Sequence, residues 1–434
     1  MMKRLNRLLG VCMCLLLLSG TLAHAYDYPF ADRYVATVLG TPAEYAYDLP
    51  KEVPLKFDTI KMFPERKIPG ILWNLDELHY SYLKQKGPAP LIFLVAGTGA
   101  SFQSAKMQVM QKAFYQAGYH VVSLSSPTHP NFIVAASTSG VPGHLEEDSS
   151  DLYQVMQSIW EKLQKKVEVT EFFLTGYSLG AAQSAFIAKL DEELDEKDRV
   201  FNFRKVLLIN PPVSLYNSVQ VLDKMLEENI PGGINNFNEF YKRLINALTD
   251  TYVHGDNVEF NDQFLYQAFK HRKPTSDEPF AALIGTDFRI SSANMVFVSD
   301  VLTKAGYIVP KGIDLRRHDS TEVYARVATH LSFVDYFKGL FLPYFQAQNP
   351  NLTERDLVEM TSLQYIEDYL RTSPKFGLIT NEDDLILLPG EVDYLRQLFG
   401  SRATIFPSGG HCGNMAYPDN VTAMVGFFQA SNQN

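Results

Sequence analysis

The residues with the clearest chemical potential form a glycine-flanked serine motif, Gly-Tyr-Ser-Leu-Gly, at residues 176–180. The motif falls between the apolar run 172–175, which predicts a strand, and a segment from Leu179 that predicts a helix. A serine on a sharp turn between a strand and a helix projects its hydroxyl above the sheet, and flanking glycines let the two elements approach closely. The helix N-terminus favours negative charge, which suits an oxyanion intermediate. The motif therefore predicts Ser178 as a nucleophile.

His411 is the predicted base for this nucleophile. A serine hydroxyl is weakly nucleophilic and needs a base that a third group orients. His411 lies in the glycine-rich loop 407–413, directly after the run 403–406, which predicts a strand. Glycines in this loop would let it bring the imidazole over the edge of the sheet. The position after the last predicted strand singles out His411 among the ten histidines of the chain.

The orienting acid is expected after the preceding strand, where residues 380–384 read Thr-Asn-Glu-Asp-Asp. We predict Asp384, which stands directly before the apolar run 385–387, and keep Asp383 as the alternative. Acidic clusters at loop tips are mostly solvated, and only one member need turn inward. With Ser178 and His411, this carboxylate would support two-step acyl transfer, in which water activated by the histidine releases the acyl group.

The elements that must position these residues alternate between strand and helix. Alternation of this length predicts a parallel sheet covered by helices on both faces, an α/β fold. The predicted strands are 91–95, 120–124, 172–175, 206–209, 376–379 and 403–406, and the predicted helices among them are 104–116, 148–165, 179–190, 391–399 and 421–429.

Two further regions do not show this alternation of strands and helices. Alternating apolar residues at 53–57 and 78–83 predict short antiparallel strands within the N-terminal part, 26–87. Residues 212–374 contain few strand-like runs, so we interpret them as a helical cap or lid inserted between the strand near 206–209 and the strand near 376–380. The core would then comprise 26–211 and 375–434. Helices are predicted in the insertion at 219–228, 238–248, 323–341 and 353–370.

The N-terminus predicts export to the periplasm or the cell exterior. A basic start is followed by the apolar stretch 8–18 and by Ala-His-Ala at 23–25, which is typical of a signal peptide at residues 1–25. The alternative is a retained membrane anchor. The last third of the segment is too polar for a good membrane span, and we find no other apolar run long enough for one.

The composition excludes some classes of partner and of bound group. The chain has 434 residues, 46% of them apolar, and a net charge of −10. An acidic surface argues against a nucleic-acid partner. Removal of residues 1–25 leaves Cys412 as the only cysteine, so neither an internal disulfide nor a thiolate metal site is expected. We predict no metal and no cofactor; the Gly-x-Gly at 97–99 lacks the rest of a dinucleotide fingerprint.

On residues 176–180, 381–384 and 409–413 and on the strand order, the chain resembles the α/β-hydrolase superfamily. The resemblance covers residues 90–211 and 375–430, and it covers the insertion only by position, where the family commonly carries a lid. The order nucleophile, acid, histidine is also the family's.

The resemblance implies an oxyanion hole made by the backbone N–H groups of Thr98, in the loop after the first core strand, and of Leu179. The loop departs from the family pattern in one respect. Ala96 stands where the family usually has a histidine.

These observations predict an exported serine hydrolase that cleaves a carboxylic ester, similar to lipases and esterases. An acyltransferase, thioesterase or amidase with the same residues, or a non-catalytic binding protein, remains the alternative. The substrate would be a small acyl compound, lipid-like if insertion aromatics line the site, although most of them would form the insertion's own core. His129, after a core strand, is a weaker candidate for the pocket wall. The aromatic residues are Phe240, Tyr241, Phe264, Tyr266, Phe269, Phe333, Tyr336, Phe337, Phe341, Tyr344 and Phe345.

Overall fold

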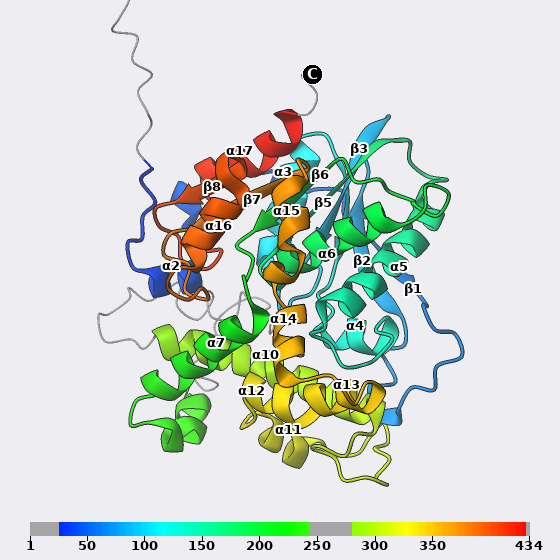
Figure 1. Ribbon diagram of the computed structural model, residues 1–434, viewed down its shortest axis with the longest axis vertical. Helices are drawn as coiled ribbons and strands as arrows, with labels where there is room; N and C mark the ends of the chain where they lie inside the picture. The colour runs from blue at the N-terminus through cyan, green and yellow to red at the C-terminus, as the bar shows by residue number, and fades with distance from the viewer. Residues whose placement is uncertain (1–25, 244–279, 431–434) are drawn as a thin grey trace, which may run out of the picture.

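A computed structural model describes residues 26–243 and 280–430 (Figure 1). The predicted signal peptide at 1–25 lies outside the described residues. So does the second half of the predicted helix 238–248, together with Phe264, Tyr266 and Phe269.

An eight-stranded sheet forms the centre of the molecule, in the order β1-β2-β4-β3-β5-β6-β7-β8. β1 and β2 are antiparallel to each other, β2 is antiparallel to β4, and all remaining pairs are parallel. The α/β prediction is therefore confirmed, although the first strand lies three residues later than the predicted 53–57. The strands are β1 (Lys56–Ile60), β2 (Leu78–Leu83), β3 (Ala89–Val95), β4 (His120–Leu124), β5 (Val169–Tyr177), β6 (Lys205–Ile209), β7 (Phe376–Asn381) and β8 (Ala403–Phe406).

Helices cover both faces of this sheet because successive strand side chains point to opposite sides. Phe93 of β3 packs toward α5 (Leu145–Leu163), α6 (Leu179–Glu193) and α16 (Glu391–Phe399). Its neighbours Ile92 and Leu94 pack toward the other face, among the apolar side chains of α3 (Ala105–Gln116) and α17 (Pro418–Gln429). Two short helices complete this part of the chain, α2 (Arg33–Leu39) and α4 (Pro130–Ala135).

Between β6 and β7 the described residues are mainly helical and add no strand to the sheet. Most of this segment lies toward the end of the molecule that is lowest in Figure 1, whereas its last helix, residues 367–372, lies higher, at the level of the sheet. Much of its apolar surface forms a separate cluster that includes Met295, Phe333 and Phe341. Its helices are α7 (Leu215–Asn229), α10 (Phe280–Thr303), α11 (Glu322–Ala328), α12 (Phe333–Tyr336), a π-helical turn (Phe337–Phe341), α13 (Leu342–Gln348), α14 (Glu354–Met360) and α15 (Glu367–Thr372).

Two predicted helices in this segment are wrong as continuous elements. The run 323–341 is broken after α11, because Ser332 and Asp335 form a capping box that starts α12. The run 353–370 is broken after α14, where Ser362 and Leu363 hydrogen-bond to the carbonyl of Val213.

The sequence reading also missed α10, the longest helix among the described residues. It is buried on several sides rather than along one stripe, so it lacks the amphipathic period that marks a surface helix. Within residues 26–243 and 280–430, no helix has both the length and the apolar character that a membrane crossing requires.

Candidate active site

Ser178 occupies a strained turn between β5 and α6. Its backbone has φ 55° and ψ −128°, a conformation that non-glycine residues rarely adopt. The two motif glycines are required by close backbone contacts. A Cβ on Gly176 would lie 2.3 Å from the carbonyl oxygen of Gly180, and a Cβ on Gly180 would lie 2.3 Å from that of Val95. The motif thus holds the serine hydroxyl at the carboxyl end of the central strands.

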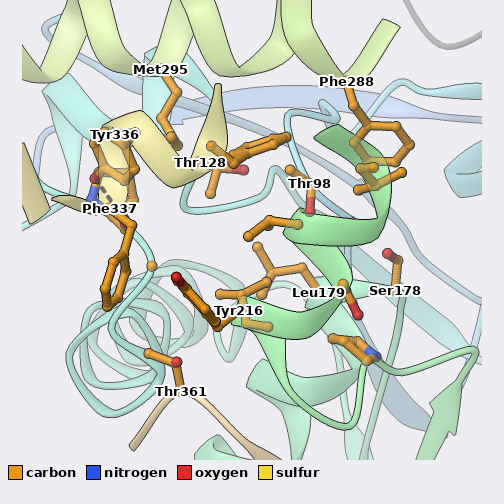
Figure 2. Close-up of a pocket in the computed structure, with 18 of the residues that line it drawn as sticks. Thr98, Thr128, Ser178, Leu179, Tyr216, Phe288, Met295, Tyr336, Phe337 and Thr361 are labelled. Atoms are coloured by element: carbon orange, nitrogen blue, oxygen red, sulfur yellow. Dashed lines mark hydrogen bonds between the residues drawn. The ribbon is translucent and has the colours of Figure 1, made fainter. Parts of the chain in front are cut away.

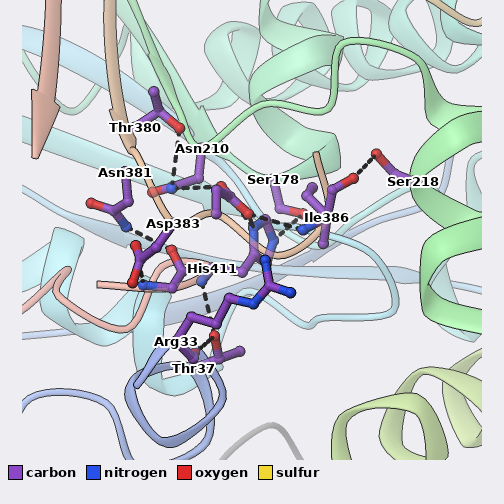
Figure 3. Close-up of polar contacts among 12 residues, drawn as sticks. Arg33, Thr37, Ser178, Asn210, Ser218, Thr380, Asn381, Asp383, Ile386 and His411 are labelled. Carbon is purple, nitrogen blue, oxygen red and sulfur yellow. Dashed lines mark hydrogen bonds and ion pairs between the residues drawn. The ribbon is translucent and has the colours of Figure 1, made fainter. Parts of the chain in front are cut away.

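His411 lies in hydrogen-bond contact with both Ser178 and Asp384 (Figure 3). Its Nε2 is 2.9 Å from the Ser178 Oγ, and its Nδ1 is 3.0 Å from Oδ1 of Asp384. All three residues are buried. With the proton on Nδ1 donated to the carboxylate, Nε2 is free to accept the hydroxyl proton of the serine. The three residues predicted from widely separated motifs therefore meet at one point.

The positions of these residues on the sheet are distinctive. The serine follows β5, the carboxylate follows β7 and the histidine follows β8. This arrangement, on a mostly parallel sheet with antiparallel strands at one edge, matches the family pattern. The chain has the α/β-hydrolase fold.

Asp384 is held by two further donors within this α/β-hydrolase site. The side-chain amide of Asn210 donates to Oδ2 at 2.8 Å, and the backbone N–H of Ile386 donates to Oδ1 at 3.2 Å. These two donors fix the orientation of the carboxylate beside the imidazole. Sequence reasoning missed Asn210, which directly follows β6 and has a positive φ of 46°. The sequence offered one signal, a polar residue placed directly after the predicted strand 206–209.

Asp383, the alternative acid, does not contact the imidazole. It accepts hydrogen bonds from the backbone N–H groups of Gly410 at 2.9 Å and Gly409 at 3.3 Å. Asn381 donates to the carbonyl oxygen of Gly410 at 2.7 Å from the end of β7. Asp383 and Asn381 therefore hold the backbone of the histidine loop, while Asp384 holds its side chain.

Helix α2 supports the same loop from the N-terminal part of the chain. The Thr37 Oγ1 accepts a hydrogen bond from the backbone N–H of His411 at 2.9 Å. A Cβ on Gly410 would lie 2.3 Å from the carbonyl oxygen of Arg33, and one on Gly413 would lie 2.1 Å from that of Ala36. The sequence predicted only strands in this region. The signal it offered was Asp32, which caps the helix by accepting hydrogen bonds from two backbone N–H groups.

Two opposing influences set the pKa of His411. Burial is the largest of them and favours the neutral imidazole, but the neighbouring Cys412 sulfur and the Asp384 carboxylate outweigh it and raise the pKa above the ordinary 6.5. Cys412 itself is buried, with a positive φ of 60° in the glycine-rich loop. The imidazolium form is therefore unusually well stabilised at this position.

Thr98 and Leu179, the residues implied for an oxyanion hole, line the same cavity as Ser178. Leu179 opens α6, and the first N–H groups of a helix have no partner within it. The loop after β3 packs tightly on the serine turn. A Cβ on Gly97 would lie 2.7 Å from the ring of Tyr177, and the N–H of Gly99 donates to the Thr128 Oγ1 at 2.7 Å.

An apolar cavity extends from Ser178 into the helical segment (Figure 2). The space between its lining atoms, with the open solvent at its entrance included, is about 740 Å³. Figure 2 shows Tyr336 and Phe337 at the end away from Ser178. Eleven aromatic residues of the insertion were considered for the pocket from the sequence, and three of them lie outside the described residues. Of the other eight, four line this cavity. They are Phe333, Tyr336, Phe337 and Phe341.

The helices that form the cavity wall are joined by one buried ion pair. Asp223 of α7 contacts the guanidinium of Arg289 on α10, with 3.4 Å between oxygen and nitrogen. The same carboxylate accepts hydrogen bonds from the backbone N–H groups of Phe333 and Val334 at the start of α12. His129, the weaker candidate for the wall, does not line the cavity and instead caps α4, where burial lowers its pKa to about 4.

Among the comparisons with known proteins, only the one with solved structures finds similar proteins. No protein-family model and no curated protein matches the chain. The chain is similar to a fungal esterase from Rhizomucor miehei, with 11% identity and a TM-score of 0.43 over 89% of this chain and 87% of that one. It is also similar to an esterase of Pyrococcus furiosus, with 11% identity and a TM-score of 0.41 over 90% and 97% of the two chains. A thioesterase domain from the curacin biosynthetic pathway has 12% identity and a TM-score of 0.38 over 86% and 99%. The fold is assigned from the strand order and the serine turn rather than from these values.

Proposed function

We propose that this protein is a serine hydrolase that cleaves a carboxylic ester through an acyl-enzyme. The observation that carries the proposal is the pair of contacts made by His411, to the hydroxyl of Ser178 and to the carboxylate of Asp384. A buried serine on a strained turn with its Oγ at 2.9 Å from an imidazole has the geometry of an activated nucleophile. A scaffold protein without turnover has no need of this arrangement.

In the proposed first step, Ser178 attacks the substrate carbonyl while His411 takes its proton. Asp384 holds the imidazole in the required tautomer and stabilises the imidazolium. The backbone N–H groups of Thr98 and Leu179 receive the negative charge on the carbonyl oxygen, a contribution worth about 10²–10³ in turnover for one donor in other hydrolases. His411 then protonates the leaving group as it departs.

In the second step, water activated by His411 attacks the acyl-enzyme and releases the carboxylic acid. The apolar cavity supports an apolar acyl group, because its walls are mainly aliphatic and aromatic side chains. The pattern at residues 1–25 supports export, with these residues removed from the working enzyme.

The proposal is tested by labelling the purified protein with a fluorophosphonate, which reacts with activated serines. We expect wild type to be labelled and Ser178→Ala not to be labelled. Ser401→Ala is the matched control, because Ser401 is exposed and precedes β8, whereas His411 follows this strand. Absence of labelling in wild type, or labelling that persists in Ser178→Ala, would overturn the proposal. Parallel assays with an ester, a thioester and an amide of one acid then identify the bond that is cleaved fastest.

A further inference from the structure

A second cavity opens beside Ser178, with about 660 Å³ of space between its lining atoms when the open solvent at its entrance is included. It shares Thr98, Ser178 and Phe288 with the apolar cavity described above, so the two spaces adjoin at the serine and at the side chain of Phe288. Figure 2 shows Phe288 near Thr98 and Ser178, on the opposite side of the apolar cavity from Phe337. The serine is therefore flanked by two spaces, which could each hold one part of an ester.

The position of His411 decides which part of the ester occupies which space. His411 lines the second cavity and does not line the apolar one. In acyl transfer the imidazole that receives the serine proton must also protonate the departing oxygen, so the leaving group has to lie on the histidine side. The acyl group then points into the apolar cavity, and the alcohol occupies the cavity with His411.

The two cavities also differ in chemistry. The second cavity is lined by Lys106 of α3 and by Asp287 and Ser291 of α10, all of them partly buried. The ammonium can donate hydrogen bonds to a ligand, the carboxylate can accept them, and the hydroxyl can do both. An uncharged alcohol with several hydroxyls can both accept from the ammonium and donate to the carboxylate, so it can use both groups without a charge of its own.

We infer that the cavity lined by His411, Lys106, Asp287 and Ser291 is a leaving-group site for an uncharged polyhydroxy alcohol. The inference rests on the proposed function and specifies its substrate class as an apolar acid esterified to a small polyol. Phe288 separates the two parts of such a substrate, and its ring borders both spaces.

The test compares two soluble esters of the same acid, glycerol monohexanoate and n-propyl hexanoate. Their leaving groups have the same three carbons and differ by two hydroxyls. The ratio of their rates of hydrolysis by hydroxide in the absence of enzyme corrects for the different acidity of the two alcohols. We expect the wild-type ratio of kcat/KM, glyceryl over propyl, to exceed the hydroxide ratio about ten-fold, which corresponds to about 1.4 kcal/mol.

The variants test the residues of the site. Lys106→Met and Ser291→Val should bring the ratio down toward the hydroxide value, whereas Asn294→Ala on the exposed side of α10 should keep the wild-type ratio. A wild-type ratio at or below the hydroxide ratio in an enzyme that fluorophosphonate labels would overturn this inference and leave the proposed function standing. A protein that neither labels nor hydrolyses either ester would overturn the proposed function, and this inference with it.

Discussion

The carboxyl end of the sheet and the helical segment between β6 and β7 are held in place in different ways. Around Ser178 and His411, backbone packs on backbone so closely that a single Cβ on Gly180 or Gly413 would lie within 2.3 Å of a carbonyl oxygen. In the helical segment the cavity wall is made by side chains, and its helices are joined by side-chain packing and by the buried pair of Asp223 and Arg289.

This difference suggests that the two regions control different properties, the rate of reaction and the choice of substrate. Hydrogen bonds and backbone contacts place the reacting atoms, which tolerate little displacement. Side-chain packing forms the cavity, and such a wall can change shape by substitution while the backbone stays in place. We therefore expect variants at the sheet end to change how fast the reaction runs, and variants in the segment to change which substrate reacts.

The largest effect is expected at the sheet end. His411→Ala should lower kcat by about 10⁴–10⁶, because the members of such a site act as a unit. Steady-state hydrolysis of p-nitrophenyl acetate measures the loss, and His318→Ala, at an exposed histidine of the helical segment, is the control. A loss below ten-fold for His411→Ala would show that this imidazole does not act as the base.

A smaller effect is expected in the cavity wall. Val219→Trp on α7 fills part of the apolar cavity, so the ratio of kcat/KM for the octanoyl over the acetyl p-nitrophenyl ester should fall about ten-fold or more. Exclusion of two methylenes, each worth about 0.8 kcal/mol when buried, gives this magnitude. Val323→Trp, at a valine that is 63% exposed, should leave the ratio unchanged. Equal losses for both esters with Val219→Trp would argue against an acyl site here.

Thr37→Val should have a modest effect, because it removes one hydrogen bond that positions the histidine loop. One such bond is worth about 0.5–1.5 kcal/mol, so kcat should fall about two- to ten-fold with little change in KM. Thr37→Ser keeps the hydroxyl and should restore the rate. A serine variant as slow as the valine variant would mean that the hydroxyl has no positioning role.

The pH dependence tests the electrostatic surroundings of His411 rather than a substitution. The proposed base must be neutral to accept a proton, and the raised pKa of His411 keeps it protonated to higher pH than a free imidazole. We therefore expect kcat/KM to rise with pH through a midpoint above 6.5. A midpoint at or below 6.5, measured with a substrate that does not titrate, would contradict the raised pKa.

The sequence was informative where local chemistry and local structure coincide. Ser178 was identified from five consecutive residues, and helix 391–399 and strand 403–406 have the predicted bounds. The choice between Asp383 and Asp384 could not be made with the same certainty, because two adjacent carboxylates differ only in the direction of their side chains. The structure places Asp384 against the imidazole and Asp383 against the loop backbone.

Long-range contacts account for what the sequence did not predict. The support that Thr37 gives to His411, the amide of Asn210 beside Asp384, and the break before Ser362 all depend on residues distant along the chain. None of these contacts leaves a periodic pattern of apolar residues in the nearby sequence. Helix α10 was not predicted for a related reason. A helix that is packed on several sides lacks a polar face, so its sequence does not show the helical period of apolar residues.

The contact between Thr37 and His411 spans 374 positions of the chain. Contacts of such long separation require the loop between their ends to close, and they form slowly compared with local structure. In a chain that emerges from the ribosome one residue at a time, Ser178 and the strands up to β6 are made long before β7, β8 and His411. On the proposed mechanism, activity is therefore acquired last, after the histidine loop has met α2, and a nascent or truncated chain carries Ser178 without the imidazole that would activate it.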